Sequence, residues 1–382
     1  MSNNIIETDR EVSEGSNGVR KWWQPVGVIV RLELRQRLRT TRWRITIAVL
    51  FLLLSLIMFG SLYLVVTVSR DTYAEWSANA YPLLVGVILF IGLILAPTLA
   101  ATSINGDRKD ATLALVQATT ISNLQLALGK LLGNWAASCV LIIVGLPYLI
   151  WAIVVAPYGI WASILGVLVM IILFGCYSAV GLGISALTAR PAGSAVITQA
   201  TVFFLILGLP AVFGLLLDST KERHTVVEKH YTYSQSSPDF DERTERCHET
   251  RSKVSYEHSE KIWWLLAPNP FLIAADSVAA YDIPPDRTYS ASKTETPLYG
   301  SIARPFARSL AEARNGPMIF DERCGRSTFT SQQGRNRVDS LIGRSWYLGL
   351  AANVVLGALG LLLATRRLRV PAAKLPRGVR IA

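Results

Sequence analysis

Residues 45–68 read ITIAVLFLLLSLIMFGSLYLVVTV and contain no charged side chain. A helix of this length reaches about 36 Å, which exceeds the ~30 Å hydrocarbon core of a bilayer. Lipid offers no water to open backbone groups, so a segment that crosses it must be helical. The stretch therefore predicts a membrane-spanning helix.

Five more runs without Asp, Glu, Lys or Arg follow, and each is about as long as a bilayer crossing requires. They are Pro82 to Ile104, Leu131 to Ala156, Ile160 to Ala189, Gly193 to Leu217 and Trp346 to Ala364. Hydrophobic residues make up 51% of the 382-residue chain and charged residues only 17%, below the roughly 25% of soluble domains. The sequence therefore predicts an all-α membrane protein with six transmembrane helices.

The net charge of +11 is unevenly distributed. Residues 218–344 hold 18 basic and 18 acidic side chains, so the excess lies elsewhere, mainly in 31–44 before the first span and 366–380 after the last. Basic residues beside spans mark the cytoplasmic side. We therefore expect a multi-pass plasma membrane protein with both termini in the cytoplasm and lipid, not nucleic acid, around it.

This pattern divides the chain into four parts. Residues 1–20 are expected to be a disordered cytoplasmic tail, and 21–217 to hold an N-terminal interfacial helix and spans one to five. Residues 218–344 form a large extracytoplasmic loop between spans five and six. Residues 345–382 hold span six and a basic cytoplasmic tail.

The expected interfacial helix precedes the first span. Val26, Val30, Leu34 and Leu38 recur every fourth residue, and arginines occupy another face, which is typical of an amphipathic helix at a membrane surface. Glu33 lies one turn before an arginine with which it can pair. A solvated basic lead-in remains the alternative.

Local signals also predict packing and helix ends. Gly175, Ala179 and Gly183 form a small-residue ladder that allows close approach of another helix, within the chain or across a dimer. Ser122 is placed to cap the third span. In the outer loop, the apolar run 262–275 is too short and proline-broken to span, and 305–314 is expected to be helical.

Cys247 and Cys324 both lie in the outer loop, where an oxidising compartment would permit a disulfide. The sequence alone does not place their sulfur atoms together. The four histidines lack zinc-motif spacing, and no Gly-x-x-x-x-Gly-Lys-Ser/Thr phosphate loop occurs. We therefore predict no metal, no catalytic residue and no cofactor in this chain. The spans also lack the ionisable groups that ion-driven transporters use.

The first inner loop carries the strongest functional signal. Its charged residues Asp107, Arg108, Lys109 and Asp110 form a cluster of both signs and precede the apolar segment that begins Thr112-Leu113. Such a mixture suits a docking surface for a cytoplasmic partner, and a solvated loop is the alternative.

The stretch from Asp107 to Leu132 resembles the first cytoplasmic loop of type 2 ATP-binding-cassette (ABC) permeases, with Thr112, Leu113 and Gly129-Lys130 in place. Lys109 and Ala111 depart from the usual acid and glycine. Further echoes are Arg190-Pro191, Ala267-Pro-Asn-Pro-Phe271 and Thr365-Arg-Arg-Leu-Arg-Val-Pro371. The subset it most resembles is that of high-GC Gram-positive bacteria.

The resemblance implies an exporter permease that forms the substrate pathway with a second permease subunit, the same or different, and binds a separate ABC ATPase subunit. The implied ATPase interface consists of Asp107, Arg108, Lys109, Asp110, Thr112, Leu113 and Arg190. The alternative function is a membrane-anchored receptor or sensor that acts through the outer loop.

Overall fold

The computed structural model describes residues 3–109, 121–156, 159–232, 246–279, 302–319, 322–324, 326–327 and 331–368. In these residues, six helical segments are long and apolar enough to cross a membrane. They cover Trp43–Val68, Tyr73–Lys109, Asn123–Val155, Ile160–Leu187, Pro191–Thr220 and Gln333–Arg367. The six predicted spans are confirmed by length and composition.

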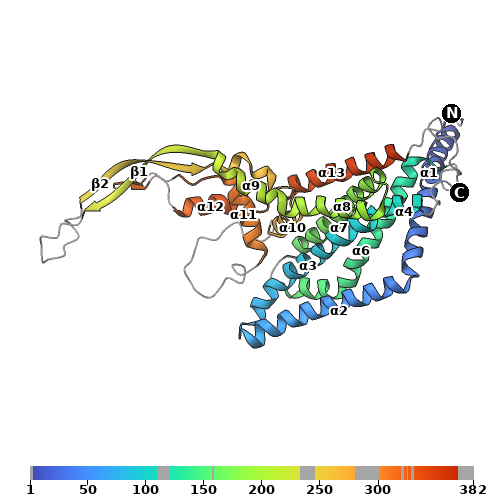
Figure 1. The fold of residues 1–382 in the computed structure, drawn as a ribbon, viewed down its shortest axis with the longest axis horizontal. Helices are drawn as coiled ribbons and strands as arrows, with labels where there is room; N and C mark the ends of the chain where they lie inside the picture. The colour runs from blue at the N-terminus through green and yellow to red at the C-terminus, as the bar shows by residue number, and fades with distance from the viewer. Residues whose placement is uncertain are drawn as a thin grey trace.

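Each span is built from one or two helices, shown in Figure 1. In chain order these are α2 (Thr41–Tyr63), α3 (Tyr73–Ala101) with α4 (Ser103–Lys109), α6 (Asn123–Val155), α7 (Ile160–Leu187), α8 (Pro191–Phe203) with α9 (Leu209–Leu217), and α13 (Trp346–Arg367). Five-residue π-helical turns follow α2 and α8, at Leu64–Val68 and Phe204–Gly208. The predicted cap of α6 is confirmed, because the Ser122 hydroxyl accepts a hydrogen bond from the Gln125 N–H and Gln125 reciprocates.

Helices α3 and α7 lie at the centre of the bundle, whereas α2 and α8–α9 are largely exposed at its edge. The small-residue ladder explains one close contact. A Cβ atom placed on Gly360 of α13 would lie 2.5 Å from the carbonyl oxygen of Ala179, and one on Gly183 would lie 2.6 Å from that of Gly360. The ladder therefore packs α7 against α13 within one chain.

The segment after the fifth span is not all helical, which corrects the all-α prediction. Strands β1 (Lys221–Thr232) and β2 (Arg246–Glu257) form an antiparallel hairpin in which Lys221 pairs with Glu257 and Thr232 with Arg246. Figure 1 shows the hairpin projecting from the bundle end opposite α1. Polar residues occupy both faces of these strands and Val226 is their one buried hydrophobic residue among those described, so the sequence lacks the apolar alternation that predicts a strand. A second short pair, β3 (Glu322–Arg323) and β4 (Arg326–Ser327), also occurs.

Short helices join the hairpin to the bundle. Helix α10 (Pro270–Ala279) begins within the apolar run 262–275 and packs against α7, α11 and α13, so this run does not span. Helix α11 (Ala303–Asn315) confirms the helix expected at 305–314, and α12 (Ser331–Leu341) precedes α13. These elements form a cap over one end of the bundle.

The first helix, α1, runs from Asn3 to Leu38. Residues 3–20 are thus helical, whereas we expected 1–20 to be disordered. No proline occurs before Pro25, so nothing in this part of the sequence breaks the helix. Figure 1 shows α1 at the same end of the bundle as the last turn of α13.

Candidate functional site

Helix α1 lies across the end of α6, where two glycines allow close contact. A Cβ atom on Gly129 would lie 2.7 Å from Ile29 Cβ, and one on Gly133 would lie 2.8 Å from Glu33 Cβ. The amide of Gln125 also donates to the backbone carbonyl of Trp22 at 2.9 Å. These glycines are what let α1 seat directly on α6.

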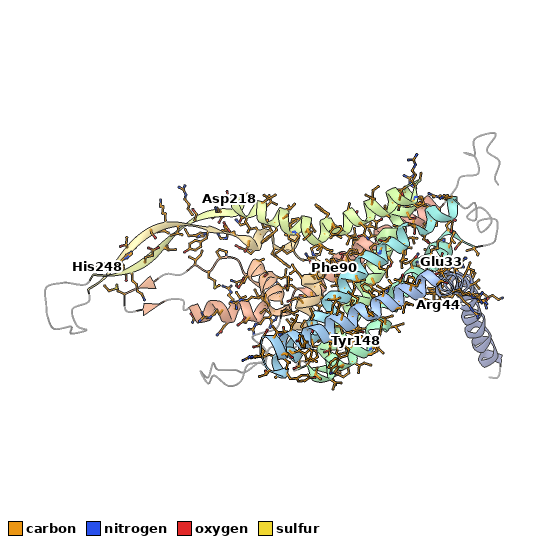
Figure 2. The ribbon with its side chains drawn as sticks, turned by 60° about the horizontal axis from the view of Figure 1, so that its bottom comes forward. Glu33, Arg44, Phe90, Tyr148, Asp218 and His248 are labelled. Carbon is orange, nitrogen blue, oxygen red and sulfur yellow. A yellow bond between two sulfur atoms is a disulfide. The ribbon has the colours of Figure 1, made fainter. Side chains whose placement is uncertain are left out.

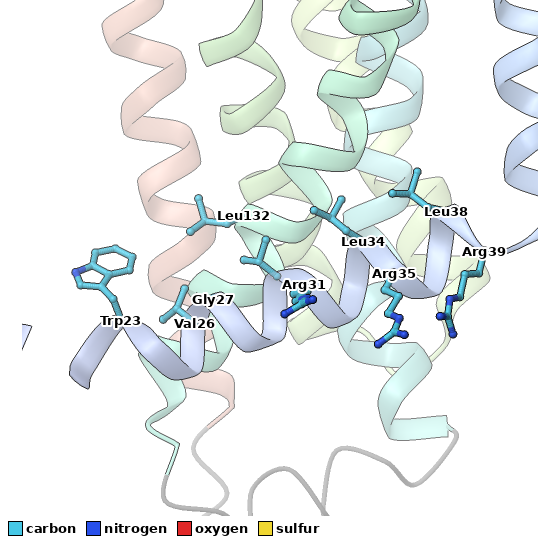
Figure 3. A pocket seen from close by; sticks show the side chains of 10 residues that line it. Trp23, Val26, Gly27, Arg31, Leu34, Arg35, Leu38, Arg39 and Leu132 are labelled. Atoms are coloured by element: carbon cyan, nitrogen blue, oxygen red, sulfur yellow. The ribbon is translucent and has the colours of Figure 1, made fainter. Parts of the chain in front are cut away.

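The two faces of α1 differ as the four-residue spacing predicts. Figure 3 shows Leu34 and Leu38 on the side toward the bundle and Arg35 and Arg39 on the opposite side. A groove of about 710 Å³ runs along this helix and is also lined by Leu132 of α6. The exposed arginines give this end of the bundle its positive charge.

Lys130 of α6 lies beneath α1 and is the centre of an ion network. Only 4% of its side chain is exposed, and its ammonium lies 3.0 Å from Glu33 Oε1 and 2.5 Å from Asp107 Oδ2. Two further contacts at 3.4 Å reach the hydroxyl and carbonyl oxygens of Ser103. We call Glu33, Lys130 and Asp107 the inner triad; it joins α1, α6 and α4 through one ammonium group.

Arg37 extends the inner triad along α1. Its guanidinium lies 3.7 Å from Glu33 Oε2, one helical turn away, and donates to Asn134 Oδ1 at 2.5 Å. Two acidic and two basic side chains therefore balance in charge. A buried lysine without such partners would be costly, and removal of one partner from a buried pair typically costs about 3–5 kcal/mol.

Helix α4 is held to α7 as well. The hydroxyl of Ser185 accepts from the backbone N–H groups of Ile104 and Asn105, at 3.1 and 3.3 Å. Arg108 donates to the backbone carbonyl of Ala186 at 3.2 Å. Helix α4 is therefore connected by polar contacts to α1, α6 and α7.

The predicted site residues are placed as follows. Asp107 and Arg108 make the inward contacts just described, Lys109 is exposed at the end of α4, and Arg190 is exposed at the start of α8. Asp110, Thr112 and Leu113 lie outside the described residues, so their positions stay a prediction. Sequence reasoning did not assign Lys130 and Glu33 to the site.

Both had visible signals. Lys130 stands directly before the predicted span from Leu131 to Ala156, and Glu33 interrupts a basic stretch.

A family model described as ABC-2 family transporter protein matches residues 28–311. The chain belongs to this family. No curated protein matches the chain. As a member of the ABC-2 family, it is a membrane component of an ABC transporter and not itself an ATPase.

The ABC-2 bundle also holds an apolar pocket of about 910 Å³ near the cap. Its walls come from α2, α3, the π-helical turn before α9, α10 and α11, and include Ile57, Phe90, Leu207 and Phe306. None of the described residues that line it is charged, and Asn269 and Ser309 are its polar members. The pocket suits an apolar or amphipathic molecule.

One pocket residue also repairs a break in the fifth span. Pro210 has no N–H to donate to the carbonyl group of Ile206 four residues earlier. The amide of Asn269 donates to this carbonyl at 2.8 Å, and its Oδ1 accepts from the N–H of Phe271 at 3.0 Å, near the start of α10. Asn269 therefore ties the cap to the kinked span.

A buried carboxylate ties the cap to the last span. Asp276 of α10, 1% exposed, accepts hydrogen bonds from the backbone N–H groups of Gly343, Ser345 and Trp346 at 2.7 to 2.9 Å. Burial raises the pKa of Asp276, and these N–H groups partly offset the rise. Two of these donors, Ser345 and Trp346, lie at the start of α13, where backbone N–H groups have no partner within the helix.

The hairpin carries two further side-chain groupings. Cys247 on β2 and Cys324 after β3 are joined as a disulfide, with Cα atoms 5.9 Å apart. At the other end of the hairpin, Glu222, His224 and His258 place one ligand atom each within 4.8 Å of one another. We expected no metal site because the histidines lack the spacing of a zinc motif along the sequence. His224 and His258 are brought together by the pairing of β1 with β2, which that spacing does not reveal.

Proposed function

We propose that the chain is the permease subunit of an ABC exporter and takes its energy from a separate ATPase subunit. The ATPase would dock at the bundle end formed by α1 and α4. Asp107, Arg108, Lys109, Asp110, Thr112, Leu113 and Arg190 remain the proposed contacts. The inner triad is the observation that carries this proposal, because its ion pairs connect α4 to α1 and α6. A movement of α4 would therefore also move these two helices.

The proposed mechanism is mechanical. ATP binding would move the ATPase, the exposed end of α4 would follow, and the ion pairs through Lys130 would pass the motion to α1 and α6. Coupling of this kind requires only that the partner contacts two states of the bundle differently. The chain itself needs no cofactor for it.

The charge pattern supports the orientation. Arg35 and Arg39 lie on the exposed face of α1, and Arg366 and Arg367 end α13. By the positive-inside rule this end belongs in the cytoplasm and the hairpin outside. Outward transport is proposed from the resemblance of the sequence to exporter permeases, and a second permease subunit, the same or different, would complete the pathway. We also propose that, among type 2 ABC permeases, the chain is most similar to those of high-GC Gram-positive bacteria.

The uncharged pocket supports a substrate that is apolar or amphipathic. It lies beside α2 and the fifth span, the two least buried spans, from which a lipid-dissolved molecule could enter. A charged solute would find no counter-charge among its described lining residues.

The test is to purify the tagged chain in mild detergent and identify what accompanies it. The proposal expects a stoichiometric subunit with a phosphate-binding Walker loop and an ATPase activity that depends on that loop. Recovery of the chain alone, without ATPase activity, would instead favour the receptor or sensor acting through the hairpin.

A further inference from the structure

The base of the hairpin brings together side chains that are distant in the sequence. Glu222 and His224 are two residues apart on β1 and so share one face of the strand. His258 follows the last residue of β2, and its N–H lies 3.4 Å from the Thr220 carbonyl oxygen. In Figure 2 this end of the hairpin is near the labelled Asp218, and His248 marks the far end.

Two of the three distances between the ligand atoms are close to those found in a metal site. His224 Nε2 lies 2.9 Å from His258 Nε2, which in turn lies 3.5 Å from Glu222 Oε2. Two ligand atoms of a tetrahedral zinc ion, each about 2.0–2.1 Å from the metal, are about 3.3 Å apart. Glu222 uses its other oxygen, Oε1, to bind Lys261, so Oε2 remains directed at the histidines.

His258 has the supporting contact that is typical of a metal-bound imidazole. Its Nδ1 lies 2.6 Å from Glu260 Oε1, and its side chain is 11% exposed. A carboxylate at Nδ1 holds the proton there, so Nε2, which forms a hydrogen bond with His224 Nε2 in this structure, can offer its lone pair to a metal in place of that bond. The sequence alone does not predict the contact between His258 and Glu260.

Glu260 supplies a second, independent indication of a missing positive charge. Its Oε2 is buried and has no hydrogen-bond partner among the described residues. It packs against Gly316, whose φ of +73° and lack of a Cβ atom leave room for the carboxylate. The side chain of Glu260 as a whole is 35% exposed, but an unpaired oxygen shielded from water is still costly. A metal ion on Nε2 would bring a positive charge to the other side of the imidazole ring.

We infer that Glu222, His224 and His258 form a binding site for a divalent transition metal, Zn²⁺ in the first instance, with Glu260 as the positioning residue. Two imidazoles and one carboxylate suit Zn²⁺ better than Ca²⁺ or Mg²⁺, which prefer all-oxygen sets. The fourth position is left to water or to a group of a bound molecule.

The bound metal would fasten the hairpin to the cap. The metal would join the first residues of β1 to His258, the residue after β2. His258 in turn contacts Glu260, which packs against Gly316 at the end of α11. The Cys247–Cys324 disulfide lies near the other end of the same hairpin. The two links would hold the strands at both ends.

The experiment measures zinc binding to the full chain in mild detergent or nanodiscs, purified through a tag without histidine. Metal content after dialysis gives the stoichiometry, and competition with a chromophoric chelator gives the affinity. We expect one Zn²⁺ per chain, loss of this ion in the His224→Ala/His258→Ala variant, and about 10–100-fold weaker binding in Glu260→Gln. Replacement by Co²⁺ should give the intense visible absorption of a four-coordinate ion.

The matched control is His230→Ala/His248→Ala, because these two histidines are exposed and pair directly across the same hairpin. It should retain the zinc ion. Size-exclusion profiles and unfolding temperatures without zinc show whether each variant is folded. No zinc in the wild type, or zinc that is lost with His230 and His248 and not with His224 and His258, would overturn the inference.

Discussion

Replacement of Lys130 by methionine removes the charge of the inner triad and keeps most of the side-chain volume. Glu33 and Asp107 would then face each other without a cation, and neither can leave without moving α1 or α4. Loss of one partner from a buried pair costs about 3–5 kcal/mol. Asp107 retains 32% of its side-chain exposure and can be hydrated, so we expect the lower figure, about 3 kcal/mol.

Hydrogen–deuterium exchange of the protein in nanodiscs is the assay, because the triad joins three helices locally. A loss of about 3 kcal/mol corresponds to roughly 100-fold faster opening of the amides in α4 and the second half of α1. The Lys130→Met/Asp107→Asn variant removes the surplus charge and should recover most of the protection. Lys109→Met is the control, since Lys109 is exposed and its loss should change stability by less than about 0.5 kcal/mol. Unchanged exchange in Lys130→Met would refute the reasoning.

Three other substitutions test the packing and the pocket. Asn269→Ala removes the hydrogen bond to the fifth span and should lower the free energy of unfolding by about 2 kcal/mol, measured by thermal unfolding. Gly133→Ala should weaken the seating of α1 by about 1–3 kcal/mol because its Cβ atom meets a neighbour at 2.8 Å, whereas Gly27→Ala, in open space, should stabilise the helix by about 0.5–1 kcal/mol. Gly86→Phe should fill the pocket without a backbone clash and abolish stimulation of the ATPase by apolar compounds, while Gly60→Phe, also in open space but outside the pocket, should not. Equal behaviour of the two members of either glycine pair would contradict the corresponding assignment.

The spans could be predicted from the sequence because the bilayer imposes a simple rule. A run such as 45–68 must be helical in lipid, whatever its neighbours are. Ser122 and the ladder around Ala179 were equally predictable, since a cap and a close helix contact depend on residue type and local spacing. The family match agrees with the motif around Gly129 and Lys130.

The hairpin and its histidines could not be predicted in this way. Its strands have no buried face, so their register comes from backbone pairing, and His224 and His258 meet only once that register is known. The role of Lys130 was hidden for a related reason. A single lysine at the end of a span is common. Its role becomes clear only when Glu33 and Asp107, which are 97 and 23 residues away in the sequence, are both seen to contact its ammonium group.

The central claim is that the α1 and α4 end of the bundle receives an ATPase, and site-specific photocrosslinking tests it most directly. A crosslinking amino acid is placed at Lys109, at Arg190 or, as the control, at His230 on the hairpin, and the complex is isolated from membranes. The account predicts a crosslinked Walker-loop ATPase from Lys109 and Arg190 and none from His230. ATPase crosslinks from His230, or none from Lys109 and Arg190 in a complex that still contains the ATPase, would contradict it.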